Sequence, residues 1–438
     1  MTINNEGYFL KCIKSKPVLL LVLSGILIRL VIFYLYRHVT LFPDSEGYIA
    51  LGNQLATFDL SGYNGQRSPG YPLLLLLSGN NLSVTLLLQF TLGICTTVLI
   101  YKSMLLLRFT TVVAFFTALI LNNWLHVIFY ETAILTESLT LFMISLIITL
   151  YLKCFFYGNY SFKKMFVLSL AFGFLVLIKP FYFFLPFIFY VFPLFKKFSI
   201  PTILNKRMVI FIFPVISFFG WSYVTKMNTG YFVSTTFYGY NIAQNCVSFA
   251  EKTPDTFHII RDIYVKNREM AKKETKDVAM SIWLSYDELR TATGLSFADL
   301  SFQLSEFSKT AIRNNPIDYL YQICISWIDF WKTGIYWNYP DFKFPLFNKC
   351  FIGLWCLQSA ILQYLKLVFV LLFPIQLHDF FIRKTITKDL FFSVIIHTTA
   401  LLQAMVTYGN NSRFSYPFEF LMVITVMLFF KRKGLLNH

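Results

Sequence analysis

The sequence predicts an all-α, polytopic membrane protein, and two observations carry this prediction. The chain has 438 residues, of which 56% are hydrophobic and only 14% are charged, and its mean hydropathy is +0.60. Continuous apolar runs of roughly 20 residues, long enough to cross a ~30 Å hydrocarbon core, recur along it. A transmembrane β-barrel would show short alternating segments instead, so the spans are expected to be helices.

About ten spans are expected from these runs. When they are threaded in order, the Lys and Arg clusters between them fall on one side, as the positive-inside rule requires. A stretch at 317–336, rich in Trp and Tyr, is interpreted as an interfacial or re-entrant helix and not as an eleventh span. The expected spans are 17–36, 84–107, 110–130, 134–152, 165–179, 181–195, 208–225, 350–375, 390–408 and 416–430.

The loops between the spans divide the chain into three parts. Residues 1–225 are expected to form a transmembrane catalytic module that includes a first outer loop at 37–83. Residues 226–349 are expected to form an outer helical domain that ends in the interfacial helix, and 350–438 the C-terminal transmembrane helices. Helix-start signals such as Thr253-Pro254-Asp255 support helices in the second part.

The positive charge of the chain follows its topology. The net charge is +16, from 38 basic and 22 acidic residues, and most of the basic residues lie in short loops between apolar runs. This distribution is typical of membrane proteins, so nucleic acid is not expected as a partner and membrane lipids are. The first apolar run is too long for a signal peptide and no cleavage site follows it, which predicts an uncleaved span. We expect an integral protein of a bacterial inner membrane.

Ionisable residues gather in the first outer loop, beside a span, where charge is costly and usually functional. The loop contains Asp44 and Glu46 and reaches Arg67 some twenty residues later. Asp44 is the candidate general base, and the alternative is a solvated acid or a helix N-cap. Glu46 is interpreted as a solvated or supporting residue.

Two further ionisable residues lie at or inside spans. Glu137, near an outer boundary, is either a second active-site acid or a partner of Arg29. Arg29 lies in the outer half of the first span, and pairing with an acid is its first interpretation, ahead of snorkelling or contact with a phosphate.

Three cations are candidate phosphate ligands: Arg67, Lys179 and Arg413. Arginine presents a planar fork that matches phosphate oxygens, whereas lysine acts as a compact charge. Lys179 is favoured because Pro180 breaks the helix beside it and can open a cavity. Snorkelling to the interface is the alternative for each.

These residues occur in motifs that resemble the GT-C superfamily of membrane glycosyltransferases, most closely the protein O-mannosyltransferases and the aminoarabinose transferases of lipid A. The chain departs at Ser45, where the family often has a second acidic residue. The resembling segments are Asp44 with Tyr48 (Asp-Glu-x-x-Tyr), Arg67-Ser68-Pro69-Gly70-Tyr71-Pro72 (Arg-Pro-x-Gly-Tyr-Pro), Thr136-Glu137-Ser138, Lys179-Pro180, Asn315-Pro316, and Arg413 before Pro417.

The resemblance implies a GT-C fold with outer catalytic loops, and transfer of a sugar from a polyprenyl-phosphate donor to an acceptor outside the cytoplasmic membrane. Asp44 would act as the base, with Glu137 as a second acid, and Tyr48 and Tyr71 would belong to the substrate-binding set. A cell-surface glycan or lipopolysaccharide is the expected acceptor. The six His residues show no metal-ligand spacing, so no metal site is assigned, although a divalent cation on a single carboxylate stays open.

Three other functions fit the same residues. A lipid-linked oligosaccharide polymerase would need Arg67 and Arg413 but not Asp44. A flippase or transporter would place its charges along a central path, often with repeated halves, and no such repeat is found. A non-catalytic assembly subunit would tolerate substitution of Asp44.

Overall fold

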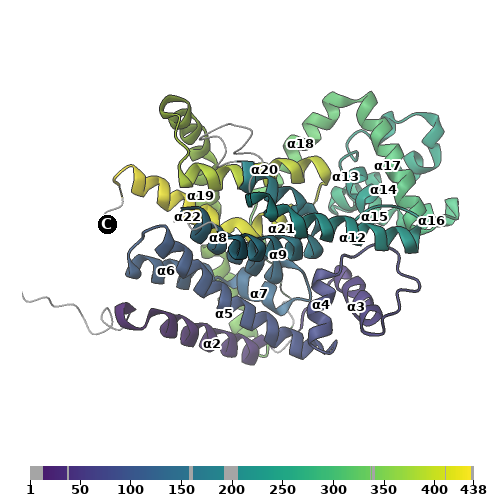
Figure 1. The fold of residues 1–438 in the computed structure, drawn as a ribbon. Coiled ribbons are helices and arrows are strands. Elements are labelled where there is room, and N and C mark those ends of the chain that lie inside the picture. The colour runs from purple at the N-terminus through teal and green to yellow at the C-terminus, as the bar shows by residue number, and fades with distance from the viewer. Residues whose placement is uncertain are drawn as a thin grey trace, which may run out of the picture.

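The structure is a computed structural model, and it describes residues 13–36, 39–156, 161–191, 206–335, 337, 341–409 and 411–435. Within these residues, seven helices are long and apolar enough to cross a membrane. They match an integral membrane protein, as the sequence predicts (Figure 1). Four of them are single helices: α2 (Pro17–Tyr36), α5 (Leu82–Leu106), α19 (Pro345–Arg383) and α20 (Lys388–Val406). The other three are the continuous stretches Glu137–Cys154, Arg207–Thr229 and Ser412–Arg432. They consist of α8 (Glu137–Tyr151) with the start of η1 (Leu152–Phe156), of η4 (Lys206–Phe211) with α12 (Ile212–Thr229), and of α21 (Ser412–Ser415), η9 (Tyr416–Phe418) and α22 (Glu419–Arg432).

An eighth span results if the bent pair α6 (Thr111–Leu121) and α7 (Leu125–Thr132), which meet at 53°, is counted as one. The sequence predicted one span at 110–130. The break falls at Asn122 and Asn123: the side chain of Asn123 donates to the Leu119 carbonyl of its own helix, and that of Asn122 donates to the Gly93 carbonyl of α5. A bond such as that of Asn123 competes with the helical ladder and favours a bend.

Two of the expected spans are not among the spanning helices of the described residues, which number seven or eight and not about ten. The segment 165–179 corresponds to α9 (Phe162–Ile178), which has 17 residues and carries two lysines in its first turn. The segment 181–195 falls on η2 (Pro180–Phe184) and α10 (Leu185–Val191), and its end lies outside the described residues. Pro180 separates η2 from α9, because a proline cannot continue the preceding helix.

The last third of the chain contains one very long helix and one short one. Helix α19 has 39 residues and is therefore roughly 58 Å long, about twice the thickness of a hydrocarbon core. Helix α18 (Pro316–Phe330) has 15 residues, or roughly 22 Å, which is too short to cross. This length agrees with the interpretation of 317–336 as a helix that does not span.

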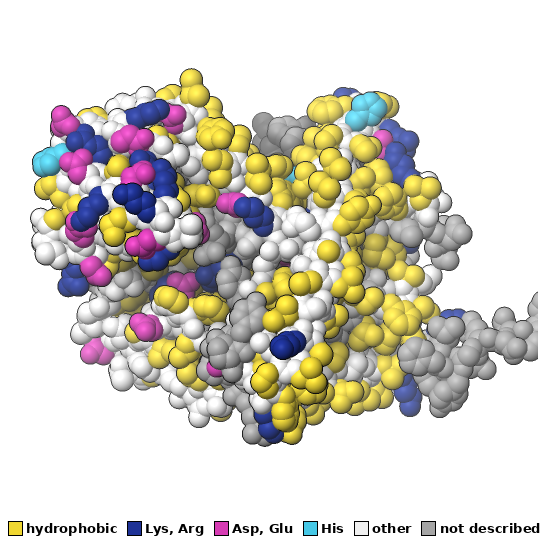
Figure 2. All heavy atoms as spheres, turned by 180° about the vertical axis from the view of Figure 1, so that it is seen from behind, with side chains coloured by type: hydrophobic (Ala, Val, Ile, Leu, Met, Phe, Trp, Pro, Cys, Tyr) yellow, Lys and Arg dark blue, Asp and Glu magenta, His cyan; other side chains and the backbone are white. Residues whose placement is uncertain are grey.

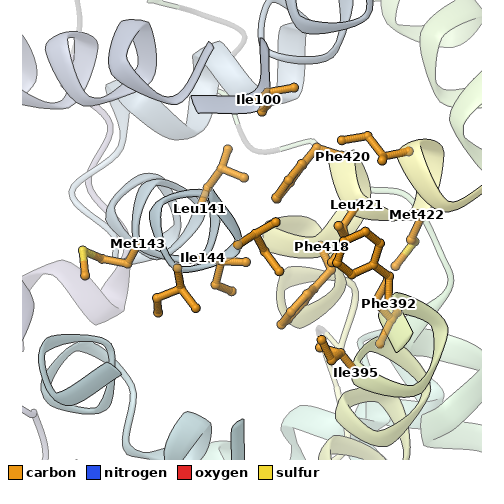
Figure 3. Close-up of a cluster of buried hydrophobic side chains, with 14 of the residues drawn as sticks. Ile100, Leu141, Met143, Ile144, Phe392, Ile395, Phe418, Phe420, Leu421 and Met422 are labelled. Atoms are coloured by element: carbon orange, nitrogen blue, oxygen red, sulfur yellow. The ribbon is translucent and has the colours of Figure 1, made fainter. Parts of the chain in front are cut away.

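Helix α8 lies at the centre of the bundle, and 78% of its apolar window is buried. It packs against α5, α9 and the turn that opens α22. Leu141 and Ile144 of α8 lie beside Phe418 and Leu421 in the main apolar core (Figure 3). A residue at the N-terminus of α8, such as Glu137, is consequently held on a rigid element.

A lobe of shorter helices follows α12 and has a core of its own, built around Tyr240, Leu300, Leu304 and Phe307. It lies at the end of the molecule that also carries α3 and α4 (Figure 1). Charged side chains cover the lobe, whereas the bundle surface is mostly apolar (Figure 2). The elements of the lobe are α13 (Tyr238–Gln244), η5 (Ala250–Lys252), η6 (Asp255–Phe257), α14 (His258–Lys273), η7 (Val278–Met280), α15 (Ser281–Leu284), α16 (Tyr286–Thr293) and α17 (Phe297–Asn314). The nearby helices of the first loop are α3 (Pro43–Ala56) and α4 (Gly70–Leu77).

Candidate active site

The start of α3 is tied to the segment that precedes α8. The backbone N–H of Thr40 donates to the Thr132 carbonyl at 3.0 Å, and the N–H of Ile134 donates to the Thr40 carbonyl at 3.1 Å. The hydroxyl of Ser45 donates to the Ile134 carbonyl at 2.8 Å and accepts from the N–H of Phe42 at 2.9 Å. These bonds bring the N-terminus of α3 next to the N-terminus of α8.

Two glycines of the resemblance motifs allow close approaches. A Cβ at Gly70 would lie 2.5 Å from the backbone nitrogen of Ile178, so only glycine lets α4 pack this closely against the end of α9. A Cβ at Gly47 would lie 2.9 Å from Nε of Arg67, so Gly47 leaves the space that the arginine fills. The first contact packs α4 against the end of α9, which Lys179 caps, and the second packs Arg67 against α3.

Five charged side chains meet at this end of the bundle, and we call them the charge network. Asp44 accepts from Nη2 of Arg67 at 2.9 Å and from Nη1 of Arg413 at 3.0 Å. Arg413 also donates to Oε1 of Glu137, from Nε at 3.0 Å and Nη2 at 2.9 Å, and Lys179 donates to the same oxygen at 3.2 Å. Three cations and two carboxylates from five separate segments are thus joined in one cluster.

The two carboxylates of the charge network differ in exposure. The side chain of Asp44 is 35% exposed, whereas that of Glu137 is fully buried. Arg413 is 20% exposed, and the other two cations less. Asp44 is therefore the more accessible carboxylate, and Arg413 forms hydrogen bonds with both.

The charge of Asp44 is stabilised by its neighbours. Burial acts to raise the pKa of Asp44, but the guanidinium groups of Arg413 and Arg67 outweigh it and lower the pKa to about 2. The group is consequently ionised at neutral pH and a weak base while both arginines bind it. A ligand phosphate that draws the arginines away would make Asp44 more basic.

Tyr48 and Tyr71 lie behind the charge network. The guanidinium of Arg67 lies 4.6 Å from the ring centre of Tyr48 and 4.6 Å from that of Phe237. Tyr48 packs edge-on against Tyr71, whose hydroxyl donates to Gln89 at 3.0 Å. Both tyrosines are buried. Tyr48 thus contacts Arg67 by a cation–π interaction, and Tyr71 supports the ring of Tyr48.

The structure brings five of the nine predicted site residues into the charge network and leaves Arg29 and Glu46 apart from it. Nε of Arg29 donates to Oε2 of Glu131 at 2.7 Å, and both side chains are only 2% exposed. The expected pairing of Arg29 with an acid is therefore present, but the partner is Glu131 and not Glu137. Gly93 leaves space for this pair, because a Cβ there would overlap both side chains. Glu46 is exposed on α3.

A metal site is not apparent in the part of the chain that the structure describes. No group of three or more His, Cys, Asp or Glu side chains there is arranged to hold an ion. Asp44 and Glu137 already bond to cationic side chains, which repel a divalent cation.

A second cluster of charges lies inside the bundle and was not predicted from the sequence. Nζ of Lys366 is 2.7 Å from one oxygen of Glu419, and Nε2 of His126 is 2.6 Å from the other. All three side chains are buried. A signal was present in the sequence, since each residue lies within an expected span, where ionisable groups are rare and usually functional.

No protein-family model and no curated protein matches this sequence. The fold and the site define a class only: a helical integral membrane protein with carboxylates and cations clustered at one end of its bundle.

Proposed function

We propose that the chain is an inverting glycosyltransferase of the GT-C type that moves a sugar from a polyprenyl-phosphate donor to a glycan or lipid-linked acceptor at the outer face of the membrane. The observation that carries the proposal is the bridge that Arg413 makes between Asp44 and Glu137. It joins the motif residues of the first loop, α8 and the last span in one cluster.

The donor phosphate would bind to the cations of the charge network. Arg67, Lys179 and Arg413 exceed the two carboxylates by one positive charge, which a phosphodiester anion would balance. The forked guanidinium groups suit phosphate oxygens, and they lie at the end of a bundle whose surface is apolar enough to meet lipid (Figure 2). A polyprenyl chain would stay in the bilayer while its phosphate reaches the cluster.

The acceptor would be activated by Asp44, the exposed carboxylate of the pair. The acceptor oxygen attacks the anomeric carbon and gives its proton to Asp44, while the bond from that carbon to the phosphate oxygen breaks. The phosphate leaves with the bonding electrons and is stabilised by the cations around it. A single displacement of this kind inverts the anomeric centre.

Donor binding would also prepare the base. Arg67 and Arg413 bind Asp44 in the free protein and lower its pKa to about 2. A phosphate that takes over their hydrogen bonds would weaken this stabilisation and raise the basicity of Asp44. Asp44 would then become an effective base only when a donor is present.

The test is turnover of a panel of polyprenyl-phosphate monosaccharides by the purified protein in lipid vesicles, with cell-envelope lipid extract as the source of acceptor. Release of polyprenyl phosphate together with a glycosylated product of inverted configuration supports the proposal. Donors that bind but are never turned over contradict it. Products lengthened by whole oligosaccharide units, formed without need for Asp44, favour the polymerase instead.

A further inference from the structure

A small cavity lies inside the bundle beside the buried cluster of Lys366, Glu419 and His126. Polar groups of Asn122, His126, Tyr416 and Glu419 line it among apolar side chains. It has about 10 Å³ of space for the centre of a water molecule. That is close to the least space that one water needs, and a buried water also needs two to four polar partners.

Three polar atoms that line the cavity have no hydrogen-bond partner in the described structure. They are Oδ1 of Asn122, Nδ1 of His126 and the hydroxyl of Tyr416. The three side chains are only 1%, 2% and 3% exposed, respectively. An unpaired buried polar atom costs about 1–3 kcal/mol, so each of these atoms would be stabilised by a partner in the cavity that its residue lines.

The other contacts of these atoms limit their hydrogen-bond roles. Nε2 of His126 bonds to Glu419, which Lys366 also binds, and Nδ1 can donate or accept according to the tautomer of the ring. The amide nitrogen of Asn122 donates to Gly93 and Thr97, so its Oδ1 is the free acceptor. The Tyr416 hydroxyl can donate.

We propose that the cavity binds one internal water molecule, which hydrogen-bonds to Nδ1 of His126, donates to Oδ1 of Asn122 and accepts from the hydroxyl of Tyr416. The water then makes three hydrogen bonds, within the range usual for buried water. All three unpaired atoms gain a partner, and no charge or proton has to move.

The water would hold the turn that carries Arg413. Tyr416 lies three residues after Arg413, and Lys366 donates to the hydroxyl of the intervening Ser415 at 2.9 Å. The buried cluster thus bonds to this turn through Lys366, and the water would connect Tyr416 of the same turn to His126 and Asn122. The site thus positions Arg413 whatever reaction the charge network performs, so the inference does not depend on the proposed function.

The first test is a structure of the full chain in lipid nanodiscs at a resolution that shows ordered water. A single density peak at roughly 2.7–3.2 Å from all three atoms supports the proposal. An empty cavity contradicts it, and so does a His126 ring turned so that Nδ1 meets a protein donor.

The second test is the nitrogen NMR signal of His126, assigned by its loss in His126→Gln. Tyr416→Phe keeps the ring that packs on Tyr130 and removes only the hydroxyl. We expect the Nδ1 signal of His126 to shift in Tyr416→Phe, because the water loses its donor. The signal of His397, which stacks on Phe373 elsewhere in the bundle, is the control and should stay. An unchanged His126 signal contradicts the proposal.

Discussion

Arg413 and Asp44 lie 369 positions apart in the chain and are joined by a hydrogen bond of 3.0 Å. The bond ties the first loop to the turn that opens the last span. Because the same guanidinium also reaches Glu137, a single side chain sets the separation of the two carboxylates. The charge network is therefore a feature of the folded chain that no local motif contains.

Arg413→Lys should separate the two carboxylates, because an ammonium cannot reproduce the fork that binds both. Each charge-assisted bond contributes about 1.5–3 kcal/mol, so we expect sugar transfer to fall roughly 10–100-fold. Arg261→Lys is the matched control, since Arg261 also pairs with two carboxylates, Asp255 and Asp262, but on the lobe. Equal turnover in both variants would show that the fork is not needed.

Gly70→Ala should strain the contact between α4 and α9. The new methyl would meet the backbone of Ile178, which cannot move aside as a flexible side chain could. We expect a loss of about 1–3 kcal/mol of stability, measured by denaturation in detergent, and weaker donor binding as Arg67 shifts. Gly220→Ala, in α12 with open space around it, should be nearly neutral. A neutral Gly70→Ala would refute the close approach.

Ser45 should not be replaceable by the second acid that the resembling family often has. Ser45 is fully buried and donates to the Ile134 carbonyl, a bond that a carboxylate cannot make. Ser45→Asp should therefore be more destabilising than Ser45→Ala, which we expect to cost about 1–3 kcal/mol. Thermal unfolding of the two variants ranks them, and a stable, active Ser45→Asp would mean that adjacent carboxylates are tolerated here.

The pairing of Asp44 should make stability depend on pH. Its pKa in the folded chain is about 2, below the ordinary value of 3.8, so its charge stabilises the fold above pH ~4 and loses this effect as the pH falls towards 2. The difference in unfolding temperature between the wild type and Asp44→Asn should shrink across that window. A difference that is constant from pH 6 to pH 2 would show that Asp44 is not paired.

The sequence predicted the helical membrane fold and the members of the charge network, because lone charges in apolar surroundings stand out. The sequence could not predict which residues these and other polar side chains contact. Ser45 bonds to Ile134, which is distant in sequence, and Arg29 pairs with Glu131 because Gly93 leaves room for both side chains.

The described residues contain fewer spanning helices than the sequence predicted, for a similar reason. Hydropathy detects apolar runs, whereas the ends of helices depend on local bonds such as that of Asn123 to the Leu119 carbonyl and on breaks such as Pro180. The cluster of Lys366, Glu419 and His126 was overlooked because each residue is single within its run. Only the packing of three helices shows that they belong together.

The most direct test of the proposed function compares sugar transfer by Asp44→Asn and Asp59→Asn in the same vesicles, with donor binding measured for each. Asp59 is an exposed acid of the same loop and lies outside the charge network. We predict that Asp44→Asn still binds the polyprenyl-phosphate sugar but loses transfer, while Asp59→Asn retains both. Transfer at the wild-type rate by Asp44→Asn would contradict its role as the base.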